Sequence, residues 1–219
     1  KDPNIETVVA NGDSLPPFDY HVPMLSLPLL LNTRLSNVPA SVPYIFPDKQ
    51  KTEQWRETIN AQIPDADLKV GIVWAGGATY KGDKQRSCTF ALFESLGKIP
   101  GITFISLQKG PPTKQAETPP EWMKLIDMGP QLNDFSDTAA LIDNLDLIVS
   151  VDTAVAHLAG ALNKPVWTLI PFSPDFRWLM DRDDSPWYPS MRLFRQKDPG
   201  GWAEVFERIA QELSDFRPQ

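Results

Sequence analysis

Cysteine and histidine are scarce in this chain of 219 residues, which has one cysteine, Cys88, and two histidines, His21 and His157. A single cysteine excludes an internal disulfide bond, so a reducing compartment, the cytoplasm, is the expected location. Because His21 lies in a proline-rich stretch, a metal site built on histidines is not expected. Nor is Cys88 expected to act as a nucleophile, since few bases are present to activate its thiol.

Basic charge and long apolar runs are lacking as well. The 28 Asp and Glu residues outnumber the 21 Lys and Arg residues, and the formal net charge is −7. A chain without an excess of positive charge is not expected to bind nucleic acid or an anionic membrane over a broad surface. No run approaches the roughly 20 apolar residues that a membrane helix needs, and no signal peptide is recognised. We therefore expect no transmembrane segment.

Three catalytic motifs are also absent. The chain contains neither the Walker A pattern of P-loop kinases nor the G-x-G-x-x-G fingerprint of NAD enzymes. It also lacks the nucleophile elbow that a Ser-His-Asp hydrolase of the α/β type requires. These three enzyme classes are disfavoured, and no resident cofactor is expected.

The most informative stretch that is present covers residues 146–172, DLIVSVDTAVAHLAGALNKPVWTLIPF. Apolar runs at 147–149 and 166–170 flank a segment rich in Ala and Leu, a pattern that predicts strand, tight turn, helix and strand. Such a unit is nearly always right-handed, with parallel strands. The helix N-terminus, at Asp152 to Ala154, offers unpaired N–H groups and the positive end of the helix dipole. An anion site is expected there, and phosphate is the usual anion.

Strands alternate with helices from Leu68 onwards. Strands are expected over 70–74, 103–107, 124–127, 147–150, 166–170 and 192–195, and helices over 90–98, 138–145, 154–162, 175–180 and 202–213. The alternation predicts an α/β fold, a Rossmann-like doubly wound parallel sheet with the strand order 3-2-1-4-5-6. Ligands bind such sheets at the carboxyl ends of the strands beside the switch point, here the first and fourth strands.

The start of the chain has a different composition. In residues 1–46, prolines recur among apolar residues that need burial, and a strand is expected only over 5–10. Because proline forbids a long helix, and because the chain starts without methionine, we interpret 1–46 as the remnant of a preceding N-terminal domain. A polar helix over 48–61 is expected in an interdomain linker at 47–66, with Trp55 and Ile59 on one face. Residues 67–219 then form the Rossmann-like domain.

The loop after the first strand, WAGGATYKGDKQRSCTF, has the composition of a phosphate-binding loop. Gly76 and Gly77 allow backbone N–H groups to approach a phosphate, and Lys84, Arg86 and Ser87 supply charge and a hydroxyl group. A solvated loop with a helix cap remains an equal alternative.

Four further positions lie near the switch point. Asp152 is expected to cap the following helix, and His157, five residues later, is either a ligand or a packed core histidine. Gln108 and Lys109 follow the second strand, where a side chain can contact a ribose or a phosphate, although a plain turn is the simpler interpretation. Phe135 is a possible wall for a base, or part of a capping motif that begins at Asp134.

The segment SVDTAVAHLAGALNKPVW resembles the D-T-G-x-x-H-L-A-A-A motif of glycosyltransferase family 9, the heptosyltransferase group. The residues that carry the resemblance are Ser150, Asp152, Thr153, His157, Leu158, Ala159 and Pro165. Together with FISLQKG, DFSDTAALI and the segment that runs from PVWTLIPF to RLFRQ, it is similar to the C-terminal catalytic region of bacterial tetratricopeptide-repeat proteins that carry such a glycosyltransferase.

The resemblance implies a GT-B fold, of which this chain would supply the C-terminal half, the domain that binds a nucleotide-sugar donor such as ADP-heptose. Together with the loop composition and the positions described above, the resemblance gives the residues expected to bind the donor. Those for the diphosphate are Gly76, Gly77, Lys84, Arg86, Ser87, Asp152, Thr153, Ala154 and His157, and those for the nucleoside are Gln108, Lys109 and Phe135. Transfer would need no metal, because the helix dipole and basic side chains can neutralise the leaving diphosphate. The catalytic base would lie in the N-terminal domain, so this chain alone is expected to be inactive. The acceptor would be a glycan or a protein.

Two positions depart from the family pattern. Ala154 replaces the glycine of the motif, and Gln108 stands where the family places an acid that contacts the ribose. These departures favour an alternative, a degenerate glycosyltransferase-like domain that acts as an interaction or scaffold module. Another nucleotide-linked α/β enzyme, such as an epimerase, is a third possibility that the missing NAD fingerprint disfavours.

Overall fold

The computed structural model describes residues 5–63, 67–77 and 79–218. The chain divides into two compact units, residues 1–38 and 39–219. Ala78 lies outside the described residues; it belongs to the loop after the first strand, residues 74–90, which is called the glycine loop below. Also outside them are residues 64–66, at the end of the expected linker, and residues 1–4 and 219, at the two ends of the chain.

Over its described residues, 5–38, the first unit contains only short helical turns: η1 (Met24–Ser26), α1 (Leu27–Leu30) and η2 (Leu35–Asn37). The strand expected over 5–10 is wrong, because these residues adopt no regular structure. A strand requires a partner to satisfy its backbone groups, and none of the elements described between residues 5 and 38 is a strand. Proline limits the helices as expected, since Pro28 stands in the first turn of α1.

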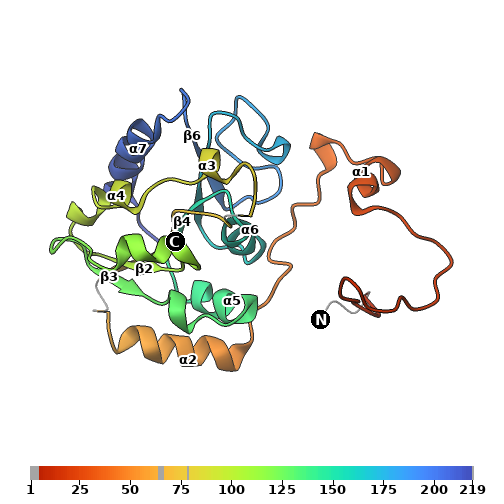
Figure 1. The fold of residues 1–219 in the computed structure, drawn as a ribbon, viewed down its shortest axis with the longest axis horizontal. Helices are drawn as coiled ribbons and strands as arrows, with labels where there is room; N and C mark the ends of the chain where they lie inside the picture. Colours follow the sequence, from red (N-terminus) through yellow and green to blue (C-terminus); the bar gives the residue numbers. More distant parts are fainter. Residues whose placement is uncertain (1–4, 64–66, 78, 219) are drawn as a thin grey trace. The chain divides into compact units, whose positions relative to one another are not determined.

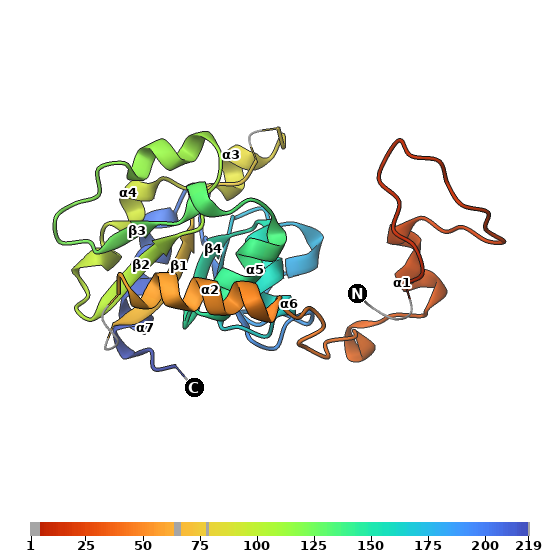
Figure 2. The ribbon, with the colours of Figure 1, turned by 90° about the horizontal axis from the view of Figure 1, so that it is seen from below.

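The second unit is built on a six-stranded sheet in the order β3-β2-β1-β4-β5-β6, with every neighbouring pair parallel. The strands are β1 (Leu68–Val73), β2 (Ile102–Ser106), β3 (Leu125–Asp127), β4 (Leu147–Val151), β5 (Val166–Ile170) and β6 (Met191–Arg195). The predicted Rossmann order is confirmed, and it places the switch point between β1 and β4. Figure 1 shows the sheet with β2, β3, β4 and β6 labelled, and Figure 2 shows β1 between β2 and β4.

The connecting helices match the prediction only in part, because no helix was expected over 83–86, 111–116 or 129–131. They are α2 (Lys49–Asn60), α3 (Asp83–Arg86), α4 (Phe90–Phe93), η3 (Leu96–Lys98), η4 (Pro111–Ala116), η5 (Gly129–Gln131), α5 (Phe135–Asp143), α6 (Ala154–Ala161), η6 (Phe176–Trp178) and α7 (Trp202–Asp215). Among the described residues none of these helices has the length and apolar character to cross a membrane.

Three helix predictions need correction. The helix expected over 90–98 is two short pieces, α4 and η3, and Gly97 lies against Met123 with no room for a side chain. The helix expected from Thr138 starts at Phe135 instead, because the carboxylate of Asp134 caps it by accepting from the N–H of Asp137 at 2.9 Å. Only one 3₁₀ turn forms in the segment 175–180.

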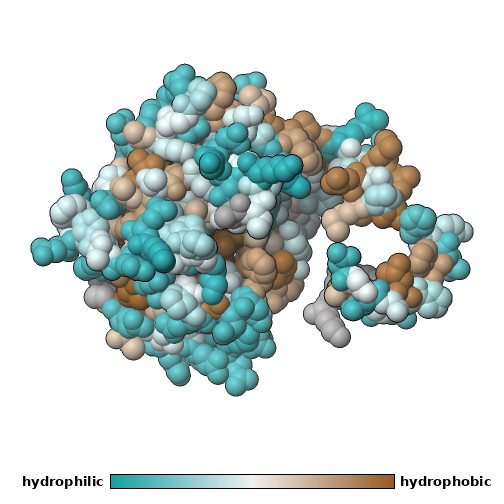
Figure 3. All heavy atoms as spheres, viewed as in Figure 1, coloured by the Kyte–Doolittle hydropathy of each residue, from teal (hydrophilic) through white to brown (hydrophobic). Residues whose placement is uncertain are grey.

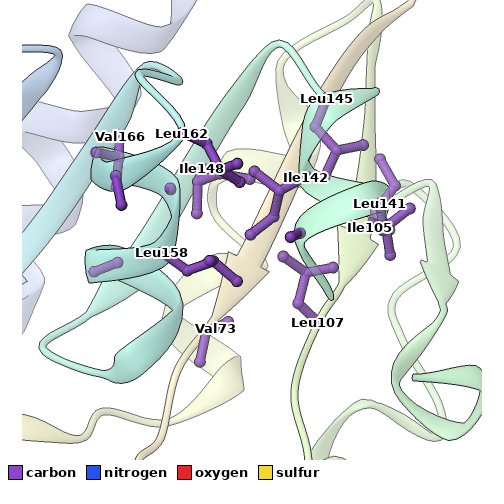
Figure 4. Packing of buried hydrophobic residues seen from close by; sticks show 14 of the residues in the cluster. Val73, Ile105, Leu107, Leu141, Ile142, Leu145, Ile148, Leu158, Leu162 and Val166 are labelled. Carbon is purple, nitrogen blue, oxygen red and sulfur yellow. The ribbon is translucent and has the colours of Figure 1, made fainter. Parts of the chain in front are cut away.

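A separate hydrophobic core lies on each face of the sheet. On one face α5 and α6 pack their leucines and isoleucines onto the sheet, as Figure 4 shows for Leu141, Leu158 and their neighbours. On the other face α4, η3 and α7 cover the sheet. Helix α2 lies along α5 (Figure 2), with Ile59 buried and Trp55 partly buried against the first core. The shared face predicted for these two residues is confirmed.

The contact between α2 and α5 contains an ion pair. The ammonium group of Lys51 donates to the Asp137 carboxylate at 2.6 Å, and the backbone and side chain of Asn133 each donate to it at 3.0 Å. The hydrogen bond from Lys51, followed by those from Asn133, lowers the pKa of Asp137 from its ordinary value of 3.8 to about 2. The pair is therefore expected to hold α2 on the sheet only while Asp137 is ionised.

Replacing Asp137 by asparagine is expected to lower the urea midpoint of unfolding at pH 7. Since the pKa is depressed in the folded state, the carboxylate stabilises the fold above pH 3.8, and its contribution disappears as the pH falls towards 2. The difference in midpoint between the unchanged chain and the variant should shrink over the same range. Urea titrations at several pH values measure this difference, and one that stays constant down to pH 2 would refute the role of the ion pair.

Candidate functional site

A cavity of about 780 Å³ opens at the carboxyl ends of β1, β2 and β4, on both sides of the switch point. Its inner wall is mostly apolar, with Val73, Leu107, Leu132 and Val155, and its rim carries Arg86. Figure 3 shows a hollow on this face of the unit, with brown apolar residues inside it. A mostly apolar pocket with a few polar groups is the usual form of a small-molecule site.

The glycine loop after β1 forms one side of this cavity. The N–H of Gly76 donates to the hydroxyl group of Ser87 at 3.0 Å, which joins the loop to the end of α3. A Cβ atom at Gly76 would collide with the guanidinium group of Arg86 and the carboxylate of Asp83, whereas one at Gly77 would meet open space. Glycine at position 76 therefore allows Arg86 to lie across the loop.

Arg86 links the two loops of the switch point. Its Nη1 donates to the main-chain oxygen of Asp152 at 2.9 Å, and its Nε donates to the Asp83 carboxylate at 3.1 Å. The guanidinium group also lies over the ring of Tyr80, 4.6 Å from the ring centre. These contacts fix a positive charge beside the start of α6.

The N-terminus of α6 faces the same cavity. Its cap is Thr153, not Asp152 as predicted, because the helix begins at Ala154, as expected, and Thr153 is the residue directly before it. The hydroxyl group of Thr153 lies 3.1 Å from that of Ser150 and makes no capping bond. No side chain in the described part of the chain caps this helix, so its first N–H groups are available to an anion.

A second hollow of about 430 Å³ adjoins the first and shares Arg86, Thr153 and Ala154 with it. The other residues that line it are Tyr80, Asp152, His157, Asp175 and Arg177. The Nε2 atom of His157 lies 3.9 Å from the carboxylate of Asp152. Arg177 is paired with Asp175 at 2.7 Å, and it adds a second guanidinium group to this hollow.

The amide of Gln108 is occupied by main-chain partners. Its oxygen accepts from the N–H groups of Trp74 and Ala75, at 3.1 and 2.9 Å, and its nitrogen donates to the carbonyl groups of Ala75 and Lys109, at 3.0 and 2.9 Å. The side chain is buried. Gln108 therefore joins the ends of β1 and β2, and the ribose contact implied by the resemblance stays a prediction.

Two other nucleoside candidates lie on the cavity wall. The ammonium group of Lys109 donates to the carbonyl groups of Gly129 and Leu132, at 2.9 and 2.7 Å, so it holds the loop before α5 in place. Phe135, at the start of α5, is 61 % exposed and available to a ligand.

Two diphosphate candidates, Lys84 and Ser87, do not line these two hollows. Together with Cys88 they line a separate cavity of about 790 Å³ between the glycine loop and the start of α7. Burial raises the pKa of the Cys88 thiol to about 12, which keeps it protonated and agrees with the expectation that it is no nucleophile.

Sequence reasoning missed Tyr80, Asp175, Arg177 and Tyr188, the last of which approaches the Nδ1 atom of His157 to 3.1 Å. Tyr80 lies in the glycine loop, whereas the other three lie in the loops after β5, where an abundance of aromatic residues was the available signal. In those loops Trp178 and Tyr188 are buried, but Phe172 and Phe176 are exposed.

Comparison with known proteins finds a family model that matches part of the chain. Residues 120–196 match the model of glycosyltransferase family 9 (heptosyltransferase). Over 203 residues the chain is 27% identical to Protein FlbA of Caulobacter vibrioides, a match that covers 91% of this chain and 33% of that protein. The resemblance drawn from the motif is thus confirmed, while the tetratricopeptide-repeat context stays a prediction.

Solved structures agree on the fold. The ADP-heptose lps heptosyltransferase II of E. coli superposes with a TM-score of 0.54 at 16% identity, over 80% of this chain and 55% of that chain. A family 9 glycosyl transferase from Veillonella parvula gives 0.54 at 13% identity, over 78% and 49%. The chain spans about a third of the curated relative and about half of each solved structure. It has the Rossmann-like fold predicted for the C-terminal half of a GT-B glycosyltransferase.

Proposed function

We propose that this chain, which carries a glycosyltransferase family 9 segment, is the donor-binding domain of a glycosyltransferase and takes a nucleoside-diphosphate sugar. One observation supports this most strongly. The apolar cavity and the polar hollow meet at Arg86 and at the N-terminus of α6. A nucleotide sugar has the same sequence of parts: an aromatic base, a charged diphosphate and a polar sugar.

Each part has a place that suits its chemistry. The base would lie in the first cavity, against Leu132, Val155 and the exposed ring of Phe135. The diphosphate would lie where Arg86 and the first N–H groups of α6 converge. The sugar would lie in the second hollow, where Asp152, His157 and Arg177 can exchange hydrogen bonds with its hydroxyl groups.

The reaction supported by this arrangement is displacement of a nucleoside diphosphate from the anomeric carbon by an acceptor hydroxyl group. Arg86 and the dipole of α6 would stabilise the charge of the leaving group without a metal. ADP-heptose is the first donor to test, since the E. coli structure is named for it. The acceptor would be a glycan or a protein. A domain other than this one would supply the catalytic base. A cytoplasmic location, expected from the single cysteine, belongs to the same proposal.

A second function rests on a specific observation. Gln108 and Lys109, the two polar residues expected to contact the nucleoside, both hold main-chain groups instead. A degenerate domain that serves as an interaction or scaffold module would keep such structural bonds and lose the ligand. Nucleotide binding distinguishes the two functions directly.

The proposal predicts that one nucleoside diphosphate raises the melting temperature of the chain in the presence of EDTA. A ligand at 100 times its Kd stabilises the folded state by about 2.7 kcal/mol. Thermal unfolding with ADP, GDP, UDP and CDP measures the effect. The Gly76→Ala variant should lose it, because the new Cβ displaces Arg86.

The control is Gly101→Ala, placed at the turn before β2 and remote from the cavity lining. It should retain the ligand-induced shift, even though the positive φ of 72° at Gly101 lowers its melting temperature. A shift of the same size in Gly76→Ala and the unchanged chain would show that the nucleotide binds elsewhere. The absence of a shift with all four nucleotides would favour the scaffold function.

A further inference from the structure

The imidazole ring of His157 is held from three sides. It stacks on the buried Trp178, with ring centres 5.1 Å apart and an angle of 21° between the planes. Its Nδ1 atom lies 3.1 Å from the hydroxyl oxygen of Tyr188. Its Nε2 atom faces the Asp152 carboxylate at 3.9 Å, in the second hollow. The two ring nitrogens therefore meet different partners, and only Nε2 faces the proposed sugar site.

Tyr188 is itself fixed against the other end of α6. It is 8% exposed, and its ring lies directly on Gly160, where a Cβ atom would overlap the ring. Its hydroxyl oxygen lies 3.5 Å from that of Tyr44. The N–H of Tyr44 donates in turn to the carbonyl group of Ala161 at 3.1 Å. The position of the Tyr188 hydroxyl group is thus determined by the backbone of α6 and by the segment before α2.

The partners of the ring select one of its two neutral tautomers. If Nδ1 carried the proton, the lone pair of Nε2 would face the carboxylate of Asp152, which is repulsive. If Nε2 carries the proton, its N–H faces that carboxylate, and Nδ1 accepts from the hydroxyl group of Tyr188. The second arrangement gives Nδ1 a hydrogen bond from Tyr188, and the hydroxyl group of Tyr44 can then donate to Tyr188. At 3.9 Å the Nε2–H is attracted by the Asp152 carboxylate but is too far from it for a hydrogen bond, so it can donate to a ligand.

We propose that Tyr188 is a positioning residue that holds His157 as the neutral Nε2–H tautomer and so presents a hydrogen-bond donor to an oxygen of the ligand in the second hollow. The nature of that ligand, a nucleoside-diphosphate sugar, rests on the proposed function. The tautomer does not, since it follows from Tyr188, Asp152 and Trp178 in the unliganded chain.

The charges around the ring agree with a neutral imidazole. Burial lowers the pKa of His157 below its ordinary value of 6.5. Asp152 and, more weakly, Asp175 act in the opposite direction, while Arg177 adds to the lowering. Burial raises the pKa of Tyr188, so its hydroxyl group keeps its proton at neutral pH. A neutral donor can bind phosphate or sugar oxygens while Arg86 supplies the positive charge.

Nitrogen-15 NMR of the histidine side chains at pH 7 tests the tautomer, and the chain suits it because His21 and His157 are its only histidines. The spectrum of a His21→Gln variant assigns the signals. We expect a single tautomer of His157 with its proton on Nε2, and in Tyr188→Phe a mixture of both tautomers. Tyr20→Phe, an exposed tyrosine of the first unit, is the matched control and should leave the spectrum unchanged.

Two results would overturn the proposal: His157 with its proton on Nδ1 or with both nitrogens protonated at pH 7, or an unchanged tautomer in Tyr188→Phe. The spectrum of the unchanged chain decides the first point even if the variant folds poorly.

Titration with ADP-heptose separates the proposed donor-binding function from the proposed positioning role of Tyr188. Tyr188→Phe should weaken binding by about two- to tenfold, the effect of one neutral hydrogen bond. If ADP-heptose and the four nucleoside diphosphates all fail to bind while the tautomer is as expected, the donor function fails and the positioning role stands.

Discussion

Replacing Arg86 by alanine is expected to weaken the binding of a nucleoside diphosphate by about 10- to 150-fold. Hydrogen bonds to a charged group contribute about 1.5–3 kcal/mol, and each 1.4 kcal/mol is a factor of ten in Kd. Both hollows share Arg86, so in the proposed arrangement, with the base in one hollow and the sugar in the other, the diphosphate lies at its guanidinium group. Calorimetric titration with and without EDTA measures the loss.

Two variants sharpen this test. Arg86→Lys keeps the charge but loses the planar fork that joins Asp152 to Asp83, so its affinity should lie between those of the unchanged chain and the alanine variant. Arg56→Ala removes an exposed arginine on α2 and should leave the affinity unchanged. Equal Kd values for Arg86→Ala and Arg56→Ala would place the diphosphate away from Arg86.

The largest expected effect on stability comes from Gln108→Ala, which should lower the free energy of unfolding by about 3–5 kcal/mol. The change leaves the N–H groups of Trp74 and Ala75 and the carbonyl group of Ala75 without their partner. A buried backbone group without a partner costs about 1–3 kcal/mol, and three such groups lie together here. Urea unfolding followed by circular dichroism measures the difference.

Gln115→Ala is the matched control for that experiment. Its amide oxygen accepts one main-chain N–H, that of Phe90 at 2.9 Å, so its loss should cost only about 1 kcal/mol. If Gln108→Ala were no more damaging than Gln115→Ala, Gln108 would not join the ends of β1 and β2 as described. A nucleotide affinity of Gln108→Ala that falls while its stability is kept would instead favour the ribose contact.

The sheet could be predicted because its signals are local. Each strand is a short apolar run bounded by turn residues, and the parallel alternation allows few strand orders. The position of the switch point, and hence of the cavity beside β1 and β4, follows from that order. The strand wrongly expected over residues 5–10 shows the limit of local signals. An apolar run does not indicate whether a partner strand exists to pair with it.

The details of the site could not be predicted, because they depend on contacts between distant residues. Nothing near Gln108 indicates that its amide reaches main-chain groups 33 and 34 residues earlier. The contact between Tyr188 and His157 spans 31 residues and depends on a glycine in α6. Asp152 was expected as the cap of α6 because Asp is a good capping residue, but the helix begins at Ala154, so Thr153, directly before it, occupies the cap position.

The most direct test of the central claim is a map of backbone amide shifts in the NMR spectrum of the chain, during titration with ADP, GDP, UDP and CDP in EDTA. We predict that one nucleotide moves the amides of Gly76, Gly77, Thr153, Ala154 and Phe135, which surround the cavity at the carboxyl ends of β1 and β4. The claim would be contradicted if no nucleotide moved these amides. It would equally be contradicted if the largest shifts fell around Gln196 and Trp202, in the cavity beside α7.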